Sequence, residues 1–378
     1  MKIKKPHGLS GKIMFKNIYS GKKILITGHT GFKGSWLTKW LLDLGADIIG
    51  ISKDIPTKPS MFKILNLSSH IQHEIVDIRN FRNTFKIIDK EKPDFIFHLA
   101  AQSIVSSSYE DPLETISSNV NGTANLLESL RILNFKCNLV IITSDKSYDN
   151  VEQVWGYKED DRIGGKDPYS GSKGAAELII KSYCNSFFKL NSNIKIAIAR
   201  AGNVIGGGDW AKDRVVVDSI SAWSNKKKVE IRNPKSTRPW QHVLEPLSGY
   251  LTLGLFLNND QVQNGEAFNF GPLSEQNRTV KDLLNDLSYY WSFNDLNDAI
   301  ILNEHNFFHE ASLLKLNCDK ANIFLNWKPS LNYDDLIKFT GEWYYNYYNS
   351  SRDMNEFTSK QIIEYTEIAI TKKIEWTA

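Results

Sequence analysis

Short apolar runs alternate with helical stretches along the first half of the chain. The runs rich in branched and aromatic residues predict buried strands, and they lie at 22–27, 46–52, 95–100, 139–143 and 194–200. Helices are predicted over WLTKWLLDLG, which stops at Gly45, over about 115–134, and from residue 168 onward. This alternation of strands and helices is typical of an α/β protein with a doubly wound parallel sheet.

The pattern changes after Gly206-Gly207-Gly208. Aromatic residues, turn residues and short elements become more frequent, and the strand–helix rhythm is lost. We expect a smaller C-terminal lobe that lies over the carboxyl edge of the sheet and binds substrate.

Composition restricts the function only weakly. The 378 residues are 41% apolar and 24% charged, with a formal net charge of +3. This charge gives no reason to expect nucleic acid or an acidic membrane as a partner. Three isolated cysteines, Cys137, Cys184 and Cys318, have no metal-ligand spacing, and we expect no metal and a cytoplasmic location. No apolar run reaches the ~18 residues of a membrane span.

A glycine-rich segment, ITGHTGFKGSWL, connects the first predicted strand to the first helix. It places Gly28, Gly31 and Gly34 at G-x-x-G-x-x-G spacing. Glycines allow the tight turn and the close approach of a pyrophosphate, and the helix N-terminus offers free N–H groups. In this context the segment predicts a dinucleotide site in a Rossmann-type domain.

The end of the second strand does not distinguish NAD from NADP. An acidic residue there would bind the ribose hydroxyls, but the strand ends in Ile51-Ser52-Lys53-Asp54. Lys53 could face a 2′-phosphate. Asp77 and Ile78 follow the next apolar stretch, where we expect the adenine amino group to be held.

Two further motifs carry polar side chains. TSDKSYDN follows the strand at 139–143 and presents Ser144, Asp145 and Lys146 together. DPYSGSK begins a helix with Asp167 and Pro168, and it places Tyr169 and Lys173 four residues apart on one helix face. An ammonium one turn away favours the phenolate, so Tyr169 can take the proton of a sugar hydroxyl while hydride leaves.

Several long segments resemble one enzyme family. They are GHTGFKGSWL, LAAQSIVSSSYEDP, TSDKSYDN, YKEDDRIGGKDPYSGSK, ARAGNVIGGGDWAKDR and STRPWQHVLEPLSGYL. Over roughly residues 20–350 the chain resembles the extended short-chain dehydrogenase/reductases, and within them the nucleotide-sugar 4,6-dehydratases. It is most similar to the branch that acts on CDP-glucose, which carries lysine at Lys146 where the dTDP-glucose branch carries glutamate.

The resemblance implies a role for each matching residue and NAD as the tightly held cofactor. Ser144 would bond the reactive sugar oxygen, Asp145 would occupy the general acid position, and Tyr169 and Lys173 match the hydride-transfer pair. Our own hypothesis is that Lys146 is the base that removes the C5 proton. The residues implied to line the cofactor are Gly28, Thr30, Gly31, Phe32, Gly34, Asp77, Ile78, Ala100, Ala101, Gln102, Thr143, Tyr169 and Lys173. Those implied to bind substrate are Gln102, Ser144, Asn203, Arg214, Arg238 and His242.

The domain organisation follows from the pattern and the resemblance together. We expect a loosely held leader over 1–20, an NAD-binding Rossmann domain over 21–204 with a return near 239–270, and a C-terminal helical extension over 351–378. The substrate-binding lobe would comprise 205–238 and 271–350. A homodimer or homotetramer is implied, with Leu178 and Ile179 on the helix that carries Tyr169 at the interface.

The paired Asp145 and Lys146 favour a dehydratase over the alternatives. Elimination of water between C5 and C6 needs a base and an acid beside adjacent carbons, whereas a nucleotide-sugar 4-epimerase needs only Ser144, Tyr169 and Lys173. A non-catalytic dinucleotide-binding protein would need none of these five residues. A nucleotide-linked hexose other than CDP-glucose stays open as the substrate.

Overall fold

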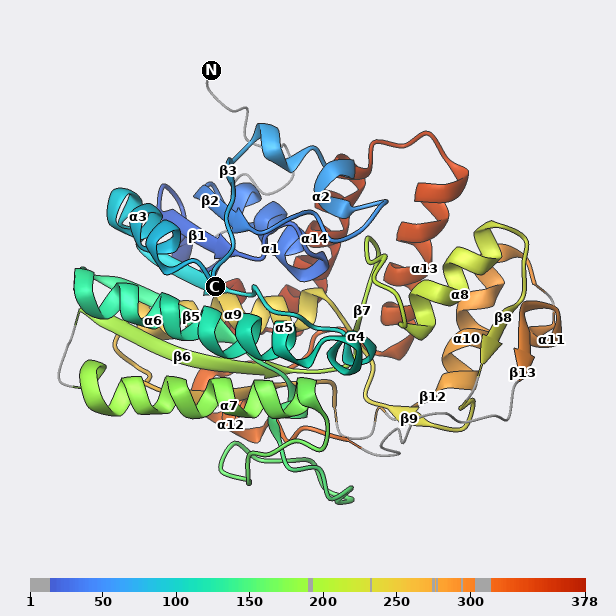
Figure 1. Cartoon of the computed structure of the whole chain (residues 1–378). Coiled ribbons are helices and arrows are strands. Elements are labelled where there is room, and N and C mark those ends of the chain that lie inside the picture. Colours follow the sequence, from blue (N-terminus) through green and yellow to red (C-terminus); the bar gives the residue numbers. More distant parts are fainter. Residues whose placement is uncertain are drawn as a thin grey trace.

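The computed structural model describes residues 14–189, 193–231, 233–273, 276, 278–293, 295–302 and 314–378. Its centre is a seven-stranded sheet in which every neighbouring pair of strands is parallel. The strands, in the order in which they lie side by side, are β3 (Gln72–Ile75), β2 (Asp47–Ser52), β1 (Lys23–Thr27), β4 (Phe95–His98), β5 (Cys137–Ile142), β6 (Ile194–Ala201) and β11 (Glu266–Phe270). The predicted doubly wound α/β fold is therefore confirmed (Figure 1).

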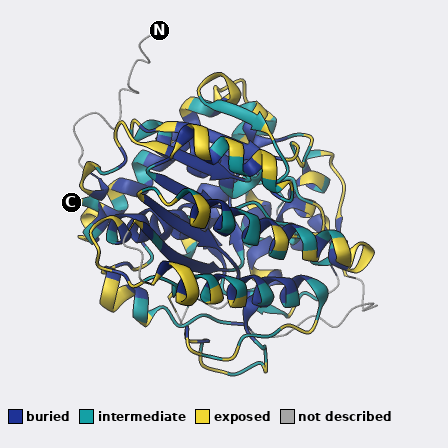
Figure 2. Ribbon diagram, turned by 60° about the vertical axis from the view of Figure 1, so that its left-hand side comes forward, coloured by how far each residue is buried: buried dark blue, intermediate teal, exposed yellow. Residues whose placement is uncertain are grey.

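Helices cover both faces of this sheet because alternate strand residues point to opposite sides. Ile24 and Ile26 join the larger apolar core, with α1 (Phe32–Asp43), α9 (Leu244–Asn258) and α14 (Met354–Thr371). Leu25 belongs to the second core, with α3 (Phe81–Glu91), α6 (Gly122–Leu133) and α7 (Pro168–Tyr183). The burial pattern agrees: the central strands are buried and the helices are buried on their inner sides, whereas the edge strand β3 is only partly buried (Figure 2).

The predicted strands and helices match observed ones with small shifts of their ends. The helix expected near 115–134 is divided into α5 (Pro112–Ile116), one π-helical turn at Ser117–Asn121, and α6. Strand β3 carries the polar sequence QHEI. It is absent from the predicted strands because three of its four residues are polar.

The smaller elements gather at one end of the sheet (Figure 1). They include three two-stranded sheets, β7 (Val204–Ile205) with β10 (Gln241–His242), β9 (Thr237–Arg238) with β12 (Arg278–Thr279), and β8 (Val229–Ile231) with β13 (Ile300–Leu302). The helices of this region are α8 (Val215–Ser224), α10 (Val280–Ser288), α11 (Leu296–Ala299) and α13 (Tyr333–Asn349), and α12 (Asp319–Leu325) packs near β11. Between them the chain returns to the main sheet through α9 and β11.

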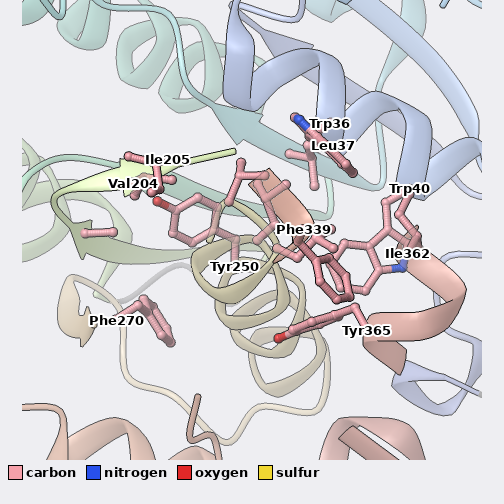
Figure 3. Packing of buried hydrophobic residues seen from close by; sticks show 14 of the residues in the cluster. Trp36, Leu37, Trp40, Val204, Ile205, Tyr250, Phe270, Phe339, Ile362 and Tyr365 are labelled. Carbon is pink, nitrogen blue, oxygen red and sulfur yellow. The ribbon is translucent and has the colours of Figure 1, made fainter. Parts of the chain in front are cut away.

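Both ends of the described chain are packed into the larger core. Phe15 is fully buried and stacks on Trp376 with 5.0 Å between ring centroids, and Tyr19 donates a hydrogen bond to the Leu251 carbonyl. The loose leader expected over 1–20 is therefore wrong for residues 14–20; the remainder lies outside the described residues. Side chains of α1, α9, α13 and α14, among them Tyr250 and Phe339, meet in the same core (Figure 3).

The parallel strands bring their carboxyl ends to one edge of the sheet, where ligands bind in open α/β folds. The residues that follow β1, β4, β5 and β6 therefore share one region, beside the smaller elements. Two short helices, α2 (Met61–Ile64) and α4 (Val105–Glu110), complete this edge. None of the described helices is long and apolar enough to cross a membrane.

Candidate active site

The segment after β5 forms one short helical turn at Asp145–Ser147, which contains two of the predicted site residues, Asp145 and Lys146. Ser144 caps this turn, since its Oγ accepts a hydrogen bond from the Lys146 backbone N–H at 3.2 Å. The same Oγ donates to Asp145 Oδ1 at 2.9 Å. Ser144 and Asp145 are 6% and 4% exposed, and Lys146 is half-buried. The turn thus presents a hydroxyl and a carboxylate in direct contact.

Tyr169 and Lys173 lie on the first two turns of α7. Asp167 caps the helix by accepting from the Ser170 N–H, and Pro168 occupies the first helical position, as the sequence predicts. Lys173 Nζ lies 6.0 Å from the centroid of the Tyr169 ring. Burial raises the pKa of Tyr169 to about 12 and lowers the pKa of Lys173 to about 8. Lys173 therefore remains mostly protonated at neutral pH.

Ser144 and Asp145 both influence the Tyr169 phenol. Burial raises the pKa of Tyr169, the Ser144 side chain lowers it, and the Asp145 charge raises it. Ser144 itself is hydrogen-bonded to Asp145. The structure thereby brings Ser144, Asp145, Tyr169 and Lys173 together.

A buried ion pair supports the turn from behind. Arg200 of β6 and Glu177 of α7 are both fully buried and form three hydrogen bonds, with Nη2 to Oε2 at 2.5 Å. Thr143 and Ser147 donate to Glu177 Oε1 at 2.7 and 2.9 Å. Arg200 also donates to Tyr148 Oη at 2.6 Å. The residues on either side of Ser144–Lys146 are thus tied to one rigid pair.

The glycine segment forms the tight cradle that its spacing predicts. Gly28 has φ +76°, and a Cβ there would lie 2.8 Å from the Ala100 backbone nitrogen. A Cβ on Gly34 would lie 2.1 Å from the Gly28 carbonyl oxygen. Gly31 caps α1, and its Cβ position is open apart from a contact at 3.4 Å. The first turn of α1, which includes Phe32, leaves its N–H groups toward this cradle, which fits a pyrophosphate.

Two residues of this segment have roles that the sequence reasoning missed. His29 is fully buried and its Nε2 lies 2.7 Å from His73 Nδ1; burial lowers its pKa to about 4. Burial also lowers the pKa of Lys33 to about 8, with Arg214 as the next cause and Asp145 acting in the opposite direction. The charges of Arg214 and Asp145 thus act on the half-buried Lys33, which becomes a further candidate for the site. Its position directly before Gly34, at a helix start, was the available signal.

The carboxylates near the predicted adenosine-binding end of the cofactor site belong to Asp77 and Glu114, and neither residue lies on the second strand. Lys53 is paired with Glu114 at 2.7 Å, and Arg79 is paired with both Asp77 and Glu114. Arg79 lowers the pKa of Asp77. Ile78 is buried, and its side chain occupies the space beside Gly122. The charge of Lys53 is thus compensated within the protein.

The residues after β4 are held by local bonds. The Ala100 N–H donates to Thr27 Oγ1 at 3.1 Å, and the Gln102 N–H donates to Asn119. The Gln102 side chain donates to Thr115 and exchanges hydrogen bonds with Ile104. Thr30 donates to the Asp54 carbonyl at 2.7 Å. Ala100, Ala101 and Thr30 border the cradle, while the Gln102 amide is already engaged within its own loop.

The expected substrate residues divide into two groups. Asn203 follows β6 at the same sheet edge, with φ +52°, and Arg214 caps α8 and pairs with Asp209 at 2.9 Å. Arg238 lies on β9 and is half-buried. His242 differs, because it is fully buried with its ring against Trp36 and Phe339. Its position argues against the predicted contact with substrate.

A small cavity of about 10 Å³ adjoins Asp145. Gly202 and Gln241 are among its lining residues, and a Cβ on Gly202 would lie 1.9 Å from Asp145 Oδ2. Gln241 donates to the carbonyls of Gly202 and Phe270 at 3.0 Å each. Among the described residues, no group of three or more His, Cys, Asp or Glu is arranged to hold a metal ion.

Comparison with known proteins identifies the family. The family model described as GDP-mannose 4,6 dehydratase matches residues 25–340. The chain belongs to this nucleotide-sugar dehydratase family of the extended short-chain dehydrogenase/reductases. The CDP-glucose 4,6-dehydratase of Salmonella typhimurium is 46% identical over 87% of this chain and 92% of its own length.

More distant relatives share the fold. The CDP-paratose 2-epimerase of Salmonella typhi is 28% identical over 85% of this chain and 98% of its own. The structure of the dTDP-glucose 4,6-dehydratase of Streptomyces venezuelae with NAD and TYD bound has a TM-score of 0.73 at 18% identity. It covers 86% of this chain and 97% of that one.

Proposed function

We propose that this protein is an NAD-dependent CDP-glucose 4,6-dehydratase, which converts CDP-D-glucose to CDP-4-keto-6-deoxy-D-glucose and water. One observation carries the proposal: a single strand end presents Ser144, Asp145 and Lys146 beside Tyr169. The family membership and the similarity to the Salmonella typhimurium enzyme support the reaction. The assignment of cytidine as the base and of glucose as the sugar depends on the similarity to that relative.

The first half of the reaction is the oxidation of C4. Bound NAD supplies the redox chemistry by accepting hydride from C4 and returning it to C6, so the reaction has no net redox change. Tyr169 takes the proton of the C4 hydroxyl, and Ser144 bonds the same oxygen. The Lys173 ammonium, 6.0 Å from the ring, favours the phenolate.

The second half is elimination. The C4 ketone acidifies the proton on C5, which Lys146 removes. Asp145 protonates the C6 oxygen, which leaves as water. Because Asp145 and Lys146 are adjacent on one turn, the acid and the base are held against neighbouring carbons. A 4-epimerase would have no use for this pair.

The charges at the adenosine end favour NAD over NADP. Lys53 and Arg79 are both neutralised by Asp77 and Glu114. A 2′-phosphate would meet two carboxylates there, whereas the ribose hydroxyls of NAD could donate to them. At the other end, the cations Lys33 and Arg214 lie next to the site and suit the phosphates of a nucleotide sugar.

The proposal extends to assembly and location. Leu178 on α7 is 59% exposed and faces outward, while Ile179 packs partly onto the second core. We assign Leu178 to a homodimer or homotetramer interface. The cysteines Cys137 and Cys184 are buried and unpaired, which suits a reducing cytoplasm.

A substrate panel tests the function. Purified protein with added NAD should release a 4-keto-6-deoxy sugar from CDP-glucose faster than from the UDP, dTDP or GDP hexoses. Mass spectrometry should show the loss of one water. NADP should support much less turnover than NAD. Formation of a 4-epimer without loss of water would replace the dehydratase proposal with the epimerase.

A further inference from the structure

Gln241, on the short strand β10, has a buried side-chain oxygen with no donor from the protein. The residue is 2% exposed, and its Nε2 donates to the carbonyls of Gly202 and Phe270 at 3.0 Å each. These two bonds fix the orientation of the amide, because the opposite orientation would set Oε1 against two other acceptors. Within the described part of the chain, Oε1 has no hydrogen-bond partner. A buried acceptor left in this state is costly, so a ligand that donates a proton is expected there.

This amide lies at the wall of the small cavity that adjoins Asp145. Gly202, whose carbonyl accepts from Gln241, lines the cavity together with Gln241 and Asp145. The Gly202 backbone also lies so close to Asp145 Oδ2 that no Cβ would fit between them. The other carboxylate oxygen, Oδ1, accepts from Ser144. Gln241 and Asp145 thus share both a cavity and a backbone neighbour.

The cavity has room for one small polar group. Its volume is about 10 Å³, which is about the least that a single water oxygen needs. Pro239, Pro272, Leu273 and Leu316 bring apolar side chains to its wall, whereas Gln276 and Lys315 are polar. A hydroxyl has one proton to donate and lone pairs that accept. One hydroxyl oxygen can therefore satisfy the Gln241 acceptor and the acid Asp145 at the same time.

We propose that Gln241 holds the C6 hydroxyl of the sugar against Asp145. The hydroxyl donates to Gln241 Oε1 and accepts from the protonated Asp145 carboxyl. Gln241 thereby positions the leaving group, a task separate from that of the acid. This inference rests on the dehydratase function proposed above, in which Asp145 protonates the C6 oxygen.

The same two contacts serve the elimination step. Lys146 takes the C5 proton, and the electron pair of the C5–H bond forms the C5–C6 double bond. The C6–O bond breaks with its electron pair on oxygen, which takes the Asp145 proton and becomes water. That water has two protons to donate, and it faces two acceptors, Gln241 Oε1 and the Asp145 carboxylate. Donors and acceptors are therefore matched both before and after the bond breaks.

A change of residue combined with a change of leaving group tests this contact. Gln241→Met keeps the length of the side chain but removes the acceptor, so loss of water from CDP-glucose should be at least about tenfold slower than in wild type. In CDP-6-deoxy-6-fluoroglucose the fluorine can accept from Asp145 but has no proton for Gln241. The variant should therefore release fluoride, measured with an ion-selective electrode, no more slowly than wild type. An equal slowing with both substrates would overturn the proposal, because it would show a general distortion of the site.

Gln361→Met is the matched control. Gln361 is also 2% exposed, donates to the Phe339 carbonyl at 2.8 Å, and has an Oε1 that lacks a partner among the described residues. It lies on α14, outside the site, so its variant should act on both substrates as wild type does. Wild-type protein that forms no product from CDP-glucose would contradict the dehydratase function instead, so the two failures are distinguishable.

A crystal structure decides the matter even if Gln241→Met does not fold. Tyr169→Phe with NAD and CDP-glucose should retain the sugar unreacted, because it lacks the base for the C4 hydroxyl. The C6 oxygen should lie within about 3.2 Å of both Gln241 Oε1 and an Asp145 carboxylate oxygen. A C6 oxygen that points away from the cavity would overturn the assignment of Gln241.

Discussion

At the scale of residues, the sequence TSDKSY divides into two sets with different tasks. Thr143, Ser147 and Tyr148 hydrogen-bond to the buried Glu177–Arg200 pair. Ser144 and Asp145 contact each other instead, and both act on the pKa of the Tyr169 phenol. The outer residues anchor the turn, and the inner ones are left for chemistry.

Replacement of Tyr169 by phenylalanine should lower turnover by about 10²–10⁴-fold, since it removes the base for the C4 hydroxyl. Substrate affinity, measured by calorimetry, should change little. Tyr183→Phe, on the same helix and away from the site, is the matched control and should retain full activity. A near wild-type rate for Tyr169→Phe would exclude its role as the base.

Lys146→Ala should still oxidise C4 and then stall, because the C5 proton is not removed. Quenched samples should contain the 4-ketohexose with its C6 hydroxyl, with little solvent deuterium at C5 by mass spectrometry. Lys146→Arg keeps the charge but lacks a usable base, so it should behave like the alanine variant. Normal deuterium entry at C5 in either variant would show that another residue is the base.

At the scale of elements, the junction of β1 with α1 depends on two close backbone approaches. Gly28 and Gly34 face backbone atoms at distances that no Cβ can occupy, whereas Gly31 does not. The spacing in the sequence does not distinguish the three glycines from one another. Packing distinguishes them: a Cβ would clash with backbone atoms at Gly28 and Gly34, whereas it would fit at Gly31.

Gly34→Ala should therefore destabilise the protein even without cofactor, because α1 must move away from the Gly28 carbonyl. A loss of about 1–3 kcal/mol is expected from overpacking, measured by urea unfolding. Gly31→Ala is the control: its stability without cofactor should stay close to wild type, while its affinity for NAD falls. Equal stability of both variants would contradict the close approach at Gly34.

At the scale of the whole molecule, Glu245 joins three distant parts of the chain. It is buried at the start of α9, accepts hydrogen bonds from the N–H groups of Ser330 and Leu331, and contacts the Tyr365 hydroxyl of α14. Burial raises the pKa of Glu245 to about 7, although these hydrogen bonds lower it. This carboxyl therefore links the sheet face to the C-terminal helix.

Stability should depend on the protonation of Glu245. An unfolded glutamate has a pKa near ~4.3, so the folded state binds more protons between about pH 4.3 and 7. The contribution is complete below pH 4.3 and is lost as pH rises through 7, by roughly 4 kcal/mol in all. Urea unfolding at pH 5 and 8 should show this loss in wild type and a smaller one in Glu245→Gln. An equal pH dependence in the two proteins would exclude Glu245 as its source.

Local patterns in the sequence were sufficient for the alternating core of the fold, for the glycine cradle and for the two helix-capped motifs. The spacing of apolar residues indicates which face of a helix or strand is buried, and the residues at turns and helix ends act on their own neighbours. Both features can therefore be predicted from residues that are close in the sequence. The polar strand β3, the packing of residues 14–20 against Trp376, and the burial of His242 could not be predicted in this way. Each depends on contacts between residues far apart in the chain.

The sequence by itself determined which chemical groups the site contains: a hydroxyl, a carboxylate, a phenol and two amines on two motifs. Only the tertiary structure decided how they are connected. It placed Ser144 against Asp145, brought Lys33 within the influence of Arg214 and Asp145, and set the Glu177–Arg200 pair behind the turn. The reason is that hydrogen bonds and charge effects depend on distances of a few ångströms between β5, α7, β6 and α1, and those distances exist only after the strands have paired and the helices have packed.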